Sequence, residues 1–203
     1  MDPVFILIRT SGRPKMFKTM MKSVKAQTYK PLITIVHSDD RQDQYVEGDL
    51  IIHGDPFPDD LGSAPYNLYC NRLLDAIPDL VGWYFFLDDD EKLHEPETVD
   101  KIVAQAKRDH LNATKAIWGT VEDPTIKKVY PDDFVISGIV ALPTCSFFLH
   151  TDHKHKARWP AERYGDYKYT SRLNLPVYWI DLIRQEQQIS KGYGKKEGDN
   201  ELC

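Results

Sequence analysis

A short apolar run near the start of the chain, Val4-Phe5-Ile6-Leu7-Ile8, leads into the turn-forming residues Thr10-Ser11-Gly12-Arg13-Pro14. A continuous apolar run that ends in a turn is typical of a strand buried on both faces. The apolar residues between Lys15 and Thr28 then recur at helical spacing, and Leu32-Ile33-Thr34-Ile35-Val36 is a second run of the first kind. Strand, helix and strand in this order predict a right-handed parallel unit.

The rest of the chain extends this pattern and then changes it. Further strands are predicted at Leu50-Ile51-Ile52 and at Trp83-Tyr84-Phe85-Phe86-Leu87, and apolar spacing predicts helices over 66–77 and 96–109. After Thr114 the predicted elements are shorter. They are strands over 116–121, 134–142 and 146–149, followed by a polar, aromatic loop and a last helix over 167–173.

These elements predict an α/β fold in a single domain over residues 1–190, since 203 residues are close to the size of one domain. The first half, about 1–110, is expected to be doubly wound. The second half, about 111–190, holds a more irregular mixture of strands. Residues 191–203 are charged and rich in glycine, and we expect them to form a mobile tail.

Composition excludes several classes of function. The 26 basic and 31 acidic residues give a net charge of −5, which argues against a general nucleic-acid-binding surface. Cys70, Cys145 and Cys203 are far apart in sequence and fit neither a disulfide framework nor a zinc site, so we expect a reducing compartment. No apolar run reaches the roughly 18 residues of a membrane span, and Met1-Asp2-Pro3 lacks the basic region of a signal peptide. We therefore expect a soluble, cytoplasmic protein.

Three predicted strands end in polar residues, at Thr10–Arg13, Ser38–Asp40 and Asp88–Asp90. The carboxyl ends of parallel strands meet at one edge of the sheet, where ligands of open α/β folds bind. The acidic triplet Asp88-Asp89-Asp90 directly follows a buried strand, and adjacent buried carboxylates are costly unless a cation neutralises them. The triplet therefore predicts a site for Mg²⁺ or Mn²⁺, completed by substrate phosphates. The alternative is an acidic turn that faces water.

The chain contains neither GxGxxG nor GxxxxGK[ST], so neither a dinucleotide fold nor a P-loop is supported. A nucleotide bound without those loops needs its phosphates held by the metal and its base held by the other strand ends. Asp39 and Asp40, at the end of the second strand, are placed to contact the base.

Several segments resemble family-2-like GT-A glycosyltransferases, in the same order along the chain and over about Pro3 to Ser190. Those enzymes carry a strand with a T-x-N-R-like turn, then S-V-x-x-Q-T-Y, a strand ending in Asp-Asp, Y-I-x-F-L-D-D-D, and G-E-D-x-x-x-x-x-R-L. The corresponding segments here are Pro3–Pro14, Ser23–Tyr29, Ile33–Asp40, Trp83–Asp90, and Gly165-Asp166 with Ser171-Arg172-Leu173.

The resemblance implies a GT-A fold, with a Rossmann-like parallel and mixed sheet flanked by helices. It implies transfer of a hexosyl or deoxyhexosyl group, with inversion, from a nucleotide-diphosphate sugar to a glycan or other hydroxyl acceptor. The expected donor is a UDP-sugar, held in the first half, and the second half faces the acceptor. Asp166 is implied as the general base, and Asp88 and Asp90 as metal ligands, with Glu186 as a further candidate ligand. The implied donor-binding residues are Thr10, Ser11, Arg13, Asp39, Asp40, Asn71, Arg72, Asp88 and Asp89.

The sequence departs from the family pattern at three places. Gly12 replaces the usual Asn before Arg13, Ser38 replaces the first Asp of the pair, and Gly165 replaces the Glu before the candidate base. The last departure leaves Glu162 open as an alternative base.

Other readings of the sequence also stay open. His150, His153 and His155 beside Asp152 form either a transition-metal site or a polar loop. An aromatic group is expected either to stack on an acceptor sugar or to belong to the core. The chain as a whole could instead be a sugar nucleotidyltransferase or a non-catalytic carbohydrate-binding or scaffold domain. The aromatic residues in question are Trp159, Tyr164, Tyr167 and Tyr169.

Overall fold

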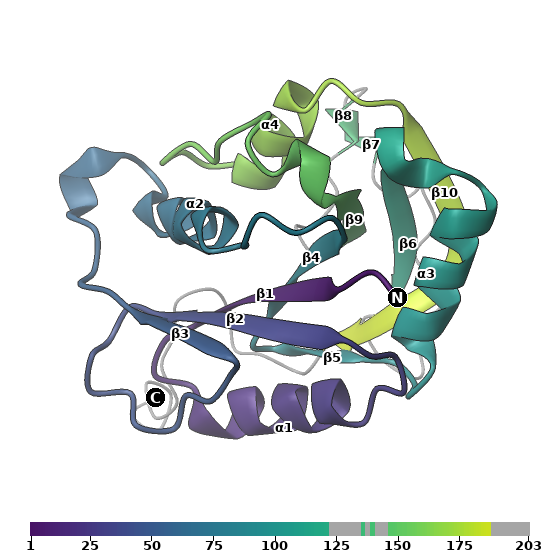
Figure 1. Ribbon diagram of the computed structural model, residues 1–203. Coiled ribbons are helices and arrows are strands. Elements are labelled where there is room, and N and C mark those ends of the chain that lie inside the picture. The colour runs from purple at the N-terminus through teal and green to yellow at the C-terminus, as the bar shows by residue number, and fades with distance from the viewer. Residues whose placement is uncertain (122–134, 137–138, 141–145, 188–203) are drawn as a thin grey trace.

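The computed structural model describes residues 1–121, 135–136, 139–140 and 146–187 of the chain (Figure 1). Its strands are β1 (Val4–Thr10), β2 (Leu32–Ser38), β3 (Leu50–His53), β4 (Trp83–Asp88), β5 (Glu91–Leu93), β6 (Lys115–Val121), β7 (Val135–Ile136), β8 (Ile139–Val140), β9 (Phe147–His150) and β10 (Val177–Gln187). Its α-helices are α1 (Pro14–Lys25), α2 (Leu68–Asp75), α3 (Thr98–Arg108) and α4 (Gly165–Arg172). The predicted tail 191–203 lies outside the described residues, as do Cys145 and Cys203.

The predicted parallel unit at the start of the chain is confirmed. β1 pairs in parallel with β2 on one side and with β4 on the other, and β2 pairs in parallel with β3. β9 then joins antiparallel to both β4 and β6, while β10 is parallel to β6 and antiparallel to β5. The result is an eight-stranded mixed sheet in the order β3-β2-β1-β4-β9-β6-β10-β5.

Helices cover both faces of the sheet, as the continuous apolar runs require (Figure 1). On β1, Val4, Ile6 and Ile8 pack with α1 and α3, whereas Phe5 and Leu7 pack on the opposite face with α2 and α4. All five side chains are fully buried. Burial of one such side chain stabilises a fold by about 1.5–3 kcal/mol. Because β1 is buried on both faces, it is a central strand of the core.

The structure differs from the sequence predictions in two respects. Residues 134–142 do not form one strand, because β7 and β8 pair with each other antiparallel within that range. The dipeptide between them, Ser137-Gly138, is of a kind that interrupts strands. In addition, β5 and β10 were not predicted. β5 has only three residues, and β10 is apolar at its start but polar toward its end.

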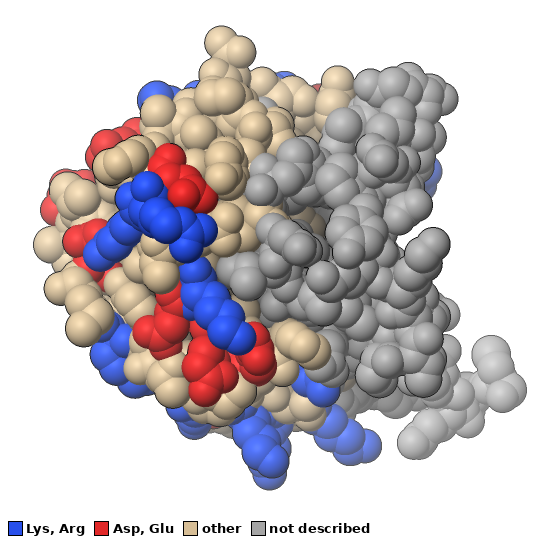
Figure 2. Space-filling model, turned by 90° about the vertical axis from the view of Figure 1, so that its right-hand side faces the viewer, with Lys and Arg blue, Asp and Glu red and all other residues tan. Residues whose placement is uncertain are grey.

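The surface carries mixed charge. Figure 2 shows basic and acidic side chains next to one another on the described part of the face at the right of Figure 1. Exposed ion pairs include Lys107 with Asp2 at 2.9 Å and Lys25 with Glu47 at 2.7 Å. Such pairs contribute less than about 1 kcal/mol each. Within the described ranges, no helix is long and apolar enough to span a membrane.

Candidate functional site

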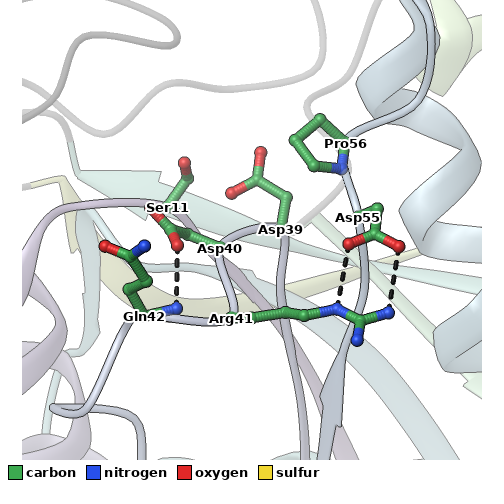
Figure 3. Close-up of a pocket in the computed structure, with 7 residues that line it drawn as sticks. All are labelled: Ser11, Asp39, Asp40, Arg41, Gln42, Asp55 and Pro56. Atoms are coloured by element: carbon green, nitrogen blue, oxygen red, sulfur yellow. Dashed lines mark hydrogen bonds and ion pairs between the residues drawn. The ribbon is translucent and has the colours of Figure 1, made fainter.

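A cavity of about 360 Å³ opens where β1, β2 and β3 end (Figure 3). Two of the three predicted polar strand ends line it, and hydrogen bonds from Thr10 and Arg13 to Asp89 and Asp90 bring the third end beside them. Three of the predicted donor-site residues line it, namely Ser11, Asp39 and Asp40. Sequence reasoning missed the other lining residues, although Asp55 and Pro56 follow the third predicted strand just as Asp39 follows the second. These missed residues are Arg41, Gln42, Asp55 and Pro56.

The side chains that line the cavity differ in the hydrogen bonds and ion pairs that they make within the protein. Asp40 Oδ1 accepts the backbone N–H of Gln42 at 2.8 Å. Arg41 pairs with both oxygens of Asp55, each at 2.9 Å. Asp39 instead points into the open space between Ser11 and Pro56 (Figure 3).

The Oδ1 atom of Asp39 is buried and has no hydrogen-bond partner among the described residues. The Asp39 carboxylate also interacts with the hydroxyl of Tyr69, whose pKa is raised by burial and by Asp39. An unsatisfied buried acceptor costs about 1–3 kcal/mol. A ligand that brings an N–H or O–H group into the cavity removes this cost. A hydrogen-bond donor that reaches Asp39 Oδ1 would therefore be favoured at this position.

The acidic triplet at the end of β4 lies against two arginines. Arg9 donates to Asp88 Oδ1 from Nη2 at 2.8 Å and from Nε at 3.1 Å. Arg13 Nη1 lies 3.1 Å from Asp89 and 3.3 Å from Asp90. Two guanidinium groups therefore already offset part of the charge of the triplet, so the triplet by itself does not require a divalent cation. The sequence pattern could not reveal Arg9 as a partner.

The three carboxylates are not equivalent. The Asp89 side chain is only 4% exposed, and it accepts the Thr10 hydroxyl at 2.8 Å. Burial raises the pKa of Asp89 to about 7, against the lowering effects of Arg13 and Thr10. Asp88 and Asp90 are more open, with side chains 23% and 16% exposed. Asp89 thus belongs to the interior, whereas Asp88 and Asp90 are partly open to solvent next to the cavity-lining turn after β1.

Asp88 and Asp90 fit the way in which Mg²⁺ is usually held, by one or two carboxylates together with substrate phosphates. Among the residues whose side chains are described, no three His, Cys, Asp or Glu gather into a site that could hold a metal by itself. The Glu186 backbone lies in register with Lys92 of β5, two residues beyond Asp90, but its side chain is outside the described part. The described residues therefore suit a cation that arrives with a diphosphate.

Arg9 also connects the triplet to the candidate base. Burial lowers the pKa of Arg9, but the charges of Asp88, Cys70 and Asp166 outweigh that effect, so the pKa is raised overall. Arg9 is paired with Asp88, and it also interacts electrostatically with Asp166, although the two carboxylates are far apart in sequence. Glu162, the alternative base, is exposed and forms an ion pair with Lys168.

Asn71 and Arg72 lie outside the residues that line the cavity. Both ends of the Asn71 amide bind the backbone of Trp159, at 2.9 and 3.0 Å, so Asn71 fastens α2 to the loop before α4. Arg72 stacks over Phe57 at 4.1 Å and lies 3.2 Å from His37. Burial and Arg72 lower the pKa of His37 to about 4, which keeps its ring neutral.

The histidine and aromatic groups are used mainly in packing. His150 and His153 are buried, and His153 Nε2 lies 2.6 Å from the carbonyl oxygen of Asn112, while His155 is exposed. Trp159 and Tyr169 stack on each other at 4.7 Å inside the core. They are therefore not available to an acceptor sugar. Tyr164 is 77% exposed, so its ring is accessible for stacking on an acceptor sugar.

Solved structures show the same fold. Over 94% of its length the chain superposes on S. aureus TarS with a TM-score of 0.66 and 15% sequence identity, and it spans 37% of that protein. The chain has the TarS fold. It also superposes on TarS 1–349 in complex with UDP, at 14% identity and a TM-score of 0.65 over 94% of this chain and 61% of that one. With TarS 1–349 in complex with UDP-GlcNAc, the sequence identity is 14% and the TM-score is 0.66, over 95% of this chain and 60% of that one.

These comparisons confirm the GT-A type of fold that the sequence resemblance predicted. No family model and no curated protein matches the chain. Because the sequence identity to TarS is low, the similarity concerns the fold, and the activity has to be argued from the site itself.

The departure at Gly165, just before the candidate base, has a structural counterpart in Asn67. A Cβ atom at Gly165 would lie 2.4 Å from the amide nitrogen of Asn67. That amide is buried and donates to the Glu162 carbonyl at 2.8 Å, so it cannot easily move aside. Asn67 therefore fills the space in which a side chain at position 165 would lie.

Replacing Gly165 with Ala is expected to lower the free energy of unfolding by about 1–3 kcal/mol, the usual cost of overpacking. The reason is the collision with Asn67, which also holds the backbone before Asp166. Urea unfolding of Gly165→Ala, Asn67→Gly and the double variant measures the effect. The double variant should lose less than the sum of the single losses, because Asn67→Gly empties the space that the new methyl group needs. Additive losses would contradict the proposed contact.

Proposed function

We propose that the protein transfers a sugar from a nucleotide-diphosphate donor, a UDP-sugar, to a hydroxyl acceptor. The observation that carries the proposal is a row of polar groups along a single edge of the sheet. Asp39 offers an unsatisfied acceptor in the cavity, Arg13 and Arg9 pair with the acidic triplet, and Asp166 interacts electrostatically with Arg9. In such a reaction Asp39 would bind the nucleobase, Arg13 and the triplet would bind the diphosphate, and Asp166 would act on the acceptor hydroxyl.

The cavity suits uracil. The imide N–H of uracil is the donor that Asp39 Oδ1 lacks, whereas cytosine carries an acceptor at the same ring position. Ser11 and Pro56 lie on either side of the Asp39 carboxylate (Figure 3). The UDP and UDP-GlcNAc complexes of TarS 1–349, which has the same fold, support this choice of nucleotide.

In this proposal the diphosphate lies beside Arg13, Asp88 and Asp90. The Nε atom of Arg13 is a buried donor with no hydrogen-bond partner among the described residues, and a phosphate oxygen is a suitable acceptor for it. Asp88 and Asp90 would hold Mn²⁺ or Mg²⁺ together with the phosphates. When bound, such a cation stabilises the negative charge of the leaving diphosphate as a Lewis acid.

Asp166 accepts the proton of the acceptor hydroxyl as that oxygen forms a bond to the anomeric carbon and the bond from that carbon to the diphosphate breaks. Attack from the face opposite the leaving group inverts the anomeric centre. Asp166 lies in the first turn of α4, where the helix dipole favours the ionised carboxylate. Its role as a base therefore depends on position more than on a high pKa.

Replacing Asp39 with Ala is expected to weaken UDP binding roughly 5- to 150-fold, which corresponds to one lost hydrogen bond of about 1–3 kcal/mol to a buried group. CDP binding should change little, so the preference for UDP over CDP should collapse. Isothermal titration calorimetry with both nucleotides and Mn²⁺ measures the ratio. Asp75→Ala, which removes an exposed carboxylate paired with Arg158 at 2.6 Å, is the control for charge. A wild-type protein that binds neither nucleotide would refute the proposed function.

A further inference from the structure

We propose that Asp43 and Tyr45 are positioning residues that fasten the turn after β1 to the end of β2, and so hold Arg13 and Asp39 ready for the donor. Neither residue lines the cavity. Both lie in the segment between β2 and β3, which sequence reasoning left without a role. The inference rests on the proposed function for the identity of its ligand.

A single oxygen of Asp43 connects the two segments. Asp43 Oδ2 accepts the Ser38 hydroxyl at 2.7 Å at the end of β2 and the backbone N–H of Gly12 at 3.3 Å in the turn after β1. The same oxygen accepts the Tyr45 hydroxyl at 3.1 Å. Hydrogen bonds to a carboxylate are stronger than those between neutral groups, so this oxygen is an effective anchor.

Tyr45 extends the connection to the acidic triplet. Its hydroxyl accepts the backbone N–H of Arg13 at 3.1 Å and lies 2.9 Å from the Thr10 hydroxyl, which in turn donates to Asp89 at 2.8 Å. The ring packs edge-on against Phe17 of α1, with ring centroids 5.5 Å apart. Burial raises the pKa of Tyr45 to about 12, so the hydroxyl keeps its proton at neutral pH.

The two consecutive amides of Gly12 and Arg13 are thus both bound by side chains from the 43–45 segment. Gly12 has φ 59°, which glycine adopts readily, and a glycine turn loses much backbone freedom when it is ordered. Ordering the backbone of a residue costs conformational entropy. When that ordering is already present in the free protein, ligand binding does not have to supply it.

The test compares Tyr45→Phe and Asp43→Asn with the wild-type protein. Tyr45→Phe removes only the hydroxyl and leaves the ring against Phe17. UDP affinity, measured by calorimetry with Mn²⁺, is expected to fall about tenfold in each variant, which equals about 1.4 kcal/mol. Amide hydrogen exchange without nucleotide is expected to speed up at Arg13 in Tyr45→Phe and at Gly12 in Asp43→Asn.

The matched control is Asp49→Asn. Asp49 Oδ2 binds the Thr34 backbone N–H at 2.7 Å and the Thr34 hydroxyl at 2.8 Å, so it is a similar carboxylate contact at the other half of β2. This variant is expected to lose stability but to bind UDP like the wild-type protein. Wild-type UDP affinity in Tyr45→Phe and in Asp43→Asn would overturn the proposal.

The hydrogen-exchange measurement separates this proposal from the proposed function. If the wild-type protein binds neither UDP nor CDP, the proposed function fails. Faster exchange at Gly12 and Arg13 in the variants still supports the connection between the two turns. Unchanged exchange at both amides overturns the connection, whatever the protein binds.

Discussion

Replacing Asp166 with Asn is expected to lower the turnover of UDP-sugar by at least about 100-fold and to leave the affinity for UDP and Mn²⁺ unchanged. The loss follows from removal of the general base, which usually contributes 10²–10⁴-fold. Asn has nearly the same shape as Asp, so the start of α4 and its contact with Asn67 are preserved. Steady-state turnover and UDP calorimetry, measured on the same preparation, separate the chemical effect from a binding effect.

Glu162→Gln is the matched control for this prediction. Glu162 lies four residues before Asp166 and is exposed, and Lys168 lowers its pKa by hydrogen bonding. Its replacement is expected to change turnover by less than about twofold, within the small effects of exposed ion pairs. Wild-type turnover in Asp166→Asn together with a large loss in Glu162→Gln would assign the base to Glu162. The released product is informative as well, since a transferase releases UDP whereas a nucleotidyltransferase releases pyrophosphate.

Replacing Asp90 with Ala is expected to weaken UDP binding in the presence of Mn²⁺ by roughly 100-fold or more. Residues that only hydrogen-bond to a metal ligand already contribute 10–100-fold to metal affinity. Asp90 is proposed as a ligand itself, so its loss should cost at least as much. The UDP affinity of the variant should also become insensitive to EDTA, whereas EDTA weakens UDP binding to the wild-type protein. Calorimetry with and without EDTA measures both effects.

The control for Asp90 is its neighbour Asp89. The Asp89 side chain is turned inward to Thr10 and Arg13, so Asp89→Asn is expected to lower stability but to keep the EDTA effect. Because Arg9 and Arg13 already offset the charge of the triplet, Mn²⁺ alone should bind weakly and UDP should strengthen its binding. Tight Mn²⁺ binding without nucleotide, or UDP binding that never depends on a divalent cation, would contradict the two-carboxylate site.

Much of the site was predictable because it depends on local pattern. Buried parallel strands appear in a sequence as continuous apolar runs, and the carboxyl ends of such strands must lie at one edge of a sheet. Two of these runs end at Asp39 and at Asp88, so the position of the candidate base-binding and metal-binding residues followed from their places after the strands. The helices that cover the sheet were predictable for the same reason, since their apolar spacing is also local.

The pairing of these residues was not predictable. Arg9 and Asp88 are 79 residues apart, and Asn67 binds a carbonyl 95 residues away. Which side chain meets which over such separations depends on how strands and helices pack, and no local spacing carries that information. The same holds for Trp159, whose burial against Tyr169 is decided by the position of α4.

The sequence by itself therefore determined the order of strands and helices in the first half and the edge of the sheet at which polar groups gather. The tertiary structure alone decided that two arginines offset the acidic triplet, that Asn67 excludes a side chain before Asp166, and that Asp43 joins two turns. The physical reason is that apolar periodicity acts within a single element, whereas charge neutralisation and hydrogen-bond satisfaction depend on groups that only folding brings together.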